Sequence, residues 1–129
     1  MKTITTTEFR DILKAHGVEN INLADREYKL MTEKDIKKMK RLLWLISLLP
    51  YKPESRDCDD YSDFAKAVIR FFFGNIAFGV IWAHGLGNTA GYHSANFFMD
   101  ENKKLHVYEP QNAKIYDFKP TGAFIKTFA

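Results

Sequence analysis

The stretch HSANFFMDENKKLHVYEP, residues 93–110, indicates two neighbouring strands joined by the polar turn ENK. Successive side chains of a strand point to opposite faces, so every second residue from His93 to Met99 faces one side. Along the second strand the residues from Leu105 to Glu109 alternate in the same way. We therefore expect an antiparallel sheet that contains this pair of strands.

The register of this pair decides which polar side chains meet. When Phe97 pairs with an apolar residue of the second strand, Glu109 falls opposite Ala95 or His93. The carboxylate can then reach the imidazole of His93. By the same alternation His106 points to the opposite face, which makes it a poorer candidate for a catalytic base.

A helix that carries the chain's single cysteine precedes these strands, beginning with CDDYSDFAKAV at residue 58. Ser55 or Asp57 can cap it, and it is predicted to run to about Phe73. One apolar face repeats at spacings of three and four. Its members are Cys58, Tyr61, Ala65, Val68 and Phe72. We expect this face to pack against the sheet, and Phe71, Phe72 and Phe73 to belong to the core.

The rest of the chain completes an α+β fold class. Two helices are predicted upstream, one ending at Gly17 and one capped by Thr32 and ended by Pro50. Downstream, AFGVIWA, AKIYDF and AFIKTF are predicted strands, and the loop HGLGNTAG is predicted to be a mobile flap. We expect one domain, 1–129, with a helical part at 1–50 and the cysteine helix and antiparallel sheet at 51–129.

Composition limits the classes of partner and compartment. The chain has 129 residues, of which 46% are hydrophobic, and its net charge is +3 with acidic and basic residues intermixed. We therefore expect no nucleic-acid partner, and no membrane partner because no apolar run is long enough to span a bilayer. One cysteine and no signal peptide at the N-terminus predict a cytoplasmic protein.

The position of Cys58 in the first helical turn favours its thiolate, because free N–H groups and the helix dipole stabilise an anion there. The neighbouring acidic residues Asp57, Asp59 and Asp60 oppose this effect. A thiol nucleophile needs an imidazole as base and a third group to orient that ring. His93 is the best placed of the four histidines, and the expected position of Glu109 makes it the orienting group.

The chain resembles papain-like cysteine peptidases in the order Cys58, His93, Glu109 and in the stretches CDDYSDFAKAV and HSANFFMDENKKLHVYEPQN. It is most similar to the peptidase-like C-terminal domain of the mushroom agglutinin family and its small phage and bacterial relatives, over roughly residues 28–118. The resemblance implies a papain-like fold and a catalytic triad of Cys58, His93 and Glu109. For the agglutinin it also implies calcium-dependent proteolysis, so calcium is the one cofactor it suggests.

The sequence departs from that family in two ways. No β-trefoil domain precedes this sequence, so lectin activity is not expected to carry over. No glutamine lies shortly before Cys58 to donate to an oxyanion, so Tyr51, Lys52 or Ser55 would have to act with the Cys58 backbone N–H.

Three hypotheses follow. The first is a cysteine hydrolase, by default a peptidase, that acts on a protein or peptide through a thioester; deamidation and transamidation use the same residues. Phage lysins also place Asp-Cys at a helix start but continue with Ser-Gly, where this chain has Asp59-Asp60. The second is a small, phage-encoded binding protein that blocks a host protein without catalysis. The third is a zinc site of Cys58, His93 and Glu109 or His84, which no paired-ligand motif supports.

Four acidic residues lie around Cys58, namely Asp57, Asp59, Asp60 and Asp63. They lack the pattern of an EF-hand calcium loop and are interpreted as residues that cap the helix.

Overall fold

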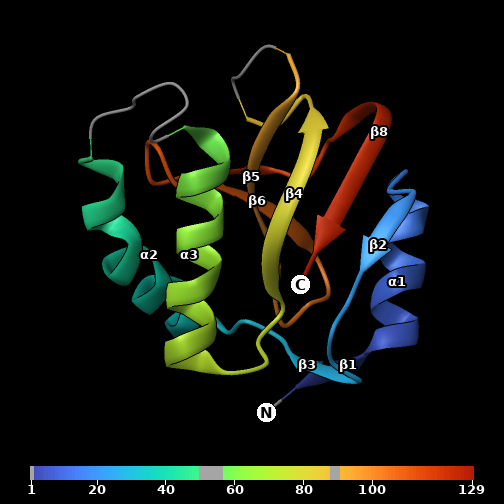
Figure 1. The fold of residues 1–129 in the computed structure, drawn as a ribbon. Coiled ribbons are helices and arrows are strands. Elements are labelled where there is room, and N and C mark those ends of the chain that lie inside the picture. The colour runs from blue at the N-terminus through green and yellow to red at the C-terminus, as the bar shows by residue number, and fades with distance from the viewer. Residues whose placement is uncertain (1, 50–56, 88–90) are drawn as a thin grey trace.

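The computed structural model of the chain describes residues 2–49, 57–87 and 91–129. It confirms the predicted α+β fold class (Figure 1). In chain order the elements are β1 (Thr3–Thr5), α1 (Thr6–Ala15), β2 (Asn20–Asn22), β3 (Glu27–Lys29), α2 (Glu33–Ser47), α3 (Cys58–Phe73), β4 (Phe78–His84), β5 (His93–Met99), β6 (Leu105–Glu109), β7 (Lys114–Asp117) and β8 (Thr121–Phe128).

A six-stranded sheet in the order β2-β8-β4-β5-β6-β7 forms the centre of the fold. All neighbours in it are antiparallel except β2 and β8, which are parallel. The strands β1 and β3 form a separate antiparallel pair. The part at 1–50, predicted as helical, therefore also contains three strands of three residues each, which are too short to show an alternating pattern.

Helices cover both faces of the sheet, and each face has its own apolar cluster. On one face α1 packs over a cluster that includes Phe97 and Val107. On the other face α2 and α3 pack over a cluster that includes Phe98 and Tyr108. Figure 1 shows α2 and α3 on one side of the strands and α1 on the other. Adjacent residues of β5 thus face different clusters, as the strand alternation requires.

The two long helices begin where the sequence predicts. At α2, Thr32 and Asp35 form a capping box: the Asp35 N–H donates to Thr32 Oγ1 at 3.1 Å and the Thr32 N–H to Asp35 Oδ2 at 3.0 Å. At α3, Asp57 is the capping residue and its N–H donates to Asp60 Oδ2 at 3.0 Å. Cys58 is therefore the first residue of α3, in the helical turn where an anion is favoured.

The exposed side of α3 differs from the prediction. Tyr61 and Ala65 are buried as expected, but Phe72 is 53% exposed and Phe71 is 84% exposed. Ile69 takes the core position instead. The assignment of Phe71 and Phe72 to the core was wrong because the buried face of α3 runs through Ala65, Ile69 and the half-buried Phe73. Phe71 and Phe72 lie off that face. In the described part of the chain no helix is both long and apolar enough to cross a bilayer.

Candidate functional site

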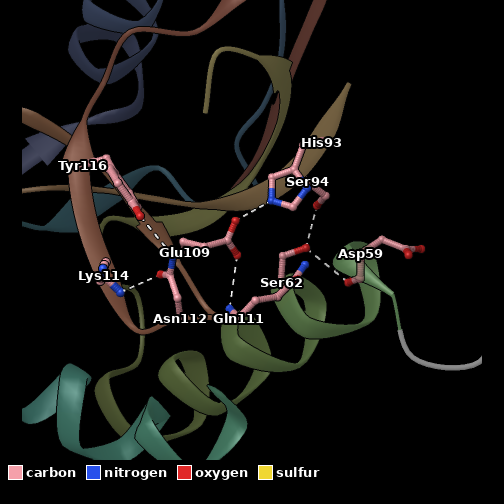
Figure 2. Close-up of polar contacts among 9 residues, drawn as sticks. All are labelled: Asp59, Ser62, His93, Ser94, Glu109, Gln111, Asn112, Lys114 and Tyr116. Carbon is pink, nitrogen blue, oxygen red and sulfur yellow. Dashed lines mark hydrogen bonds and ion pairs between the residues drawn. The ribbon is translucent and has the colours of Figure 1, made fainter. Parts of the chain in front are cut away.

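The register of β5 and β6 brings His93 and Glu109 together. Phe97 pairs with Val107, one of the two pairings that the sequence allowed. Glu109 follows two residues after Val107 in β6, and its Oε1 makes a short contact with His93 Nε2 (Figure 2). His93 is 8% exposed and Glu109 is 4% exposed, so the pair lies inside the protein.

The carboxylate of Glu109 fixes one side of the imidazole ring. Its second oxygen, Oε2, accepts the backbone N–H of Gln111 at 3.2 Å, which holds the carboxylate in place (Figure 2). Because Nε2 of His93 is used by Glu109, the ring has Nδ1 left for another partner. A base oriented through one nitrogen and free at the other has the arrangement required of the middle member of a catalytic triad.

A buried polar network ties the start of α3 to the strand that carries His93. Ser62 Oγ and Ser94 Oγ are 2.6 Å apart, and Ser62 Oγ also donates to the backbone carbonyl of Asp59 at 3.2 Å (Figure 2). Asn96 Nδ2 donates to the carbonyl of Ser62 at 2.9 Å and to that of Gly79 at 3.0 Å. Sequence reasoning missed this network, although polar residues inside the buried pattern of α3 and β5 are a signal that could have found it.

The Cys58 thiol is half-buried at the first turn of α3. Burial raises the pKa of Cys58, the backbone N–H of Ser94 acts against this, and the charges of Asp57 and Asp59 raise the pKa further. No hydrogen bond joins the thiol to His93 in the described part of the chain. The structure thus places Cys58 beside Ser94, the neighbour of His93, but does not pair the thiol with the imidazole.

Aromatic side chains lie on the face of the sheet that carries Ser94. Trp82 of β4 pairs across the strands with Ser94, so the two side chains share a face. The Trp82 ring stacks on Tyr92, with centroids 5.6 Å apart and an interplanar angle of 23°. Lys126 Nζ lies 5.9 Å from the Trp82 ring, and the His84 ring lies 5.5 Å from that of Tyr92. Tyr92 is 43% exposed, so this surface can contact another molecule.

The other predicted residues lie elsewhere or outside the described residues. His84 is the exposed last residue of β4. His106 Nε2 contacts Asp100 Oδ2 at 2.8 Å, and the ring stacks on Phe98, so it is occupied away from the cysteine as expected. The proposed oxyanion donors Tyr51, Lys52 and Ser55 fall within residues 50–56, which the structure does not describe.

The acidic residues at the start of α3 lie close enough together to share a metal ion. Side-chain oxygens of Asp57, Asp59 and Asp60 lie within 4.8 Å of one another. Calcium takes about six to eight oxygen ligands, and Asp60 Oδ2 already accepts an N–H. In the described ranges, the ligands of the zinc hypothesis, Cys58 and His93 with a third residue, do not come together as a metal-binding group.

No protein-family model and no curated protein matches the chain. Among solved structures, PSL1a in its complex with E64 matches with a TM-score of 0.77 at 19% identity. The Polyporus squamosus lectin bound to the human-type influenza-binding epitope Neu5Acα2-6Galβ1-4GlcNAc matches with a TM-score of 0.72 at 18% identity. Both matches cover 96% of this chain but only 50% and 49% of those chains, so this chain spans about half their length. The likeness shows a shared fold, in agreement with the resemblance to the agglutinin family.

Proposed function

We propose that this chain is a small binding protein on a peptidase-like fold, and that it binds an extended protein segment where Trp82 and Tyr92 adjoin Cys58. The observation that carries the proposal is the stacked, partly exposed ring pair of Trp82 and Tyr92. It shares a sheet face with Ser94, whose backbone N–H lies at Cys58. Rigid aromatic side chains supply large contact area at low entropic cost, which makes them frequent anchors of binding sites.

The state of the thiol supports binding over catalysis. Burial and two neighbouring carboxylates raise the pKa of Cys58, and the thiol has no hydrogen bond with His93 within the described residues. An attacking cysteine needs the opposite, a lowered pKa and an imidazole within reach. One of the matched structures is a lectin with a bound glycan, so a protein that contains this fold can have a binding function.

A cysteine hydrolase is the second candidate, and the buried pair of His93 and Glu109 favours it. In that reaction the Cys58 sulfur would bond to the carbonyl carbon of an amide while His93 takes the thiol proton. The C–N bond then breaks, and the leaving nitrogen takes the proton from His93. Water hydrolyses the thioester, which releases the acid and restores the thiol. Glu109 would hold the imidazole through Nε2. The complex of PSL1a with E64 is compatible with a reactive thiol on this fold.

The first prediction separates these candidates with Trp82 as the reporter. In a Trp44→Phe protein, unfolded casein is expected to quench Trp82 fluorescence to saturation. Cys58→Ala should leave the Kd within about twofold, whereas Tyr92→Ala should raise it about tenfold, because stacking area is lost. Phe71→Ala is the matched control, an exposed aromatic residue on α3 that should change nothing.

Other outcomes of this titration are equally informative. Casein fragments that the wild type produces and Cys58→Ala does not would show that the site hydrolyses its ligand, and the binding proposal would be abandoned. Quenching by the trisaccharide Neu5Acα2-6Galβ1-4GlcNAc and not by casein would replace a protein ligand by a glycan. No quenching by either probe would reject the site at Trp82 and Tyr92.

A further inference from the structure

The outer face of α2 carries basic side chains toward the start of the helix and apolar side chains toward its end. Residues spaced by four, three and four lie on one stripe of a helix. One such stripe is Lys37, Arg41, Trp44 and Leu48, all of them exposed. The first half of the stripe is basic and the second half is apolar. Leu45, next to this stripe, continues the apolar half.

The apolar half is unusually exposed for a surface helix. Trp44 is 54% exposed, Leu45 is 64% exposed and Leu48 is 59% exposed. The opposite face of α2 contacts the core through Met39 and Leu43, which are fully buried. These three exposed side chains therefore do not support the fold, and a contiguous apolar surface of this kind marks a site of interaction.

The basic half of this face carries several positive charges. Exposed basic residues on this side of α2 are Lys34, Lys37, Lys40 and Arg41. Lys38 is turned toward α3, where its Nζ lies 5.1 Å from the centre of the Phe73 ring. Within the described ranges none of them forms an ion pair. Asp35 of the same helix is used in the capping box. An anionic partner is complementary to this half of the face.

We propose that this face, the α2 outer face, docks onto an anionic lipid bilayer. Trp44, Leu45 and Leu48 would enter the boundary between headgroups and acyl chains, where tryptophan is favoured, and the basic half would lie on the lipid phosphates. The expectation of no membrane partner rested on the absence of a spanning segment, and an interfacial contact needs none. A second copy of the chain is disfavoured, because an isologous contact would bring two basic surfaces together.

The test uses vesicle binding by the whole chain. In a Trp82→Phe background, Trp44 is the single tryptophan and its emission should shift to the blue with vesicles containing about 30% phosphatidylserine. Co-sedimentation should be at least about tenfold stronger than with pure phosphatidylcholine, and about 0.5 M salt should abolish it. Charge reversal by Lys37→Glu with Arg41→Glu, and truncation by Leu45→Ser with Leu48→Ser, should each remove binding.

The control is Phe71→Ser, which removes a more exposed apolar side chain from a different helix and should leave vesicle binding unchanged. Three results would overturn the proposal. They are no binding to phosphatidylserine vesicles, equal binding to neutral vesicles, and concentration-dependent dimers that Leu45→Ser dissolves. The last result would show that a second copy covers this face.

Discussion

Asn96→Ala is expected to lower the free energy of unfolding by about 3 kcal/mol. The Asn96 side chain is fully buried in β5 and donates to two backbone carbonyls, that of Ser62 in α3 and that of Gly79 in β4. Alanine cannot replace either donor, so two buried acceptors each lose a partner and a small cavity remains. The measurement is urea unfolding followed by circular dichroism, read as the change in midpoint at constant slope.

Asn102→Ala is the matched control for this prediction. Asn102 is exposed, and its hydrogen bond to Asp100 uses the backbone N–H, which alanine keeps. We expect a change within about 0.5 kcal/mol. A loss at Asn96 no larger than that would mean that α3 is held to the sheet by apolar packing alone, and the network of Ser62, Ser94 and Asn96 would lose its structural role.

The sequence predicted those parts of the fold that show a repeating pattern. Strand alternation limited the partner of Phe97 to Val107 or Leu105, and the structure has the Val107 pairing, which brings Glu109 to His93. The capping box at Thr32 was equally local and equally visible. The strand β2 could not be predicted, because three residues show no period and its partner β8 lies about a hundred residues away.

Properties that depend on the three-dimensional surroundings were harder to predict. A helical period shows which residues share a face, but Phe71, Phe72 and Phe73 are consecutive and equally apolar. The pattern therefore did not show that only Phe73 of the three packs against the core. At Cys58 the local rule favours a thiolate through the helix N-terminus, whereas burial against β5 raises the thiol pKa. The reactivity of this cysteine therefore depends on a balance that the sequence pattern does not contain.

Alkylation of Cys58 by iodoacetamide is expected to be slower at pH 7 than alkylation of a cysteine in a short unstructured peptide. The reagent reacts with the thiolate, and the raised pKa of Cys58 lowers the thiolate fraction at every pH below that pKa. The rate should therefore rise about tenfold per pH unit and should not level off before pH 9. Mass spectrometry of the intact protein gives the rate, since Cys58 is the single cysteine of the chain.

The decisive comparison is between two histidine variants. Among the described residues, neither the His93 ring nor the His106 ring is hydrogen-bonded to the thiol. His93→Ala should therefore leave the rate within about twofold of the wild type. His106→Ala, whose ring contacts Asp100 instead, is the matched control and should behave alike. Fast alkylation near pH 6 that His93→Ala abolishes and His106→Ala preserves would demonstrate a thiolate–imidazolium pair. Cys58, His93 and Glu109 would then act as a catalytic triad, and hydrolysis would displace binding as the function of this site.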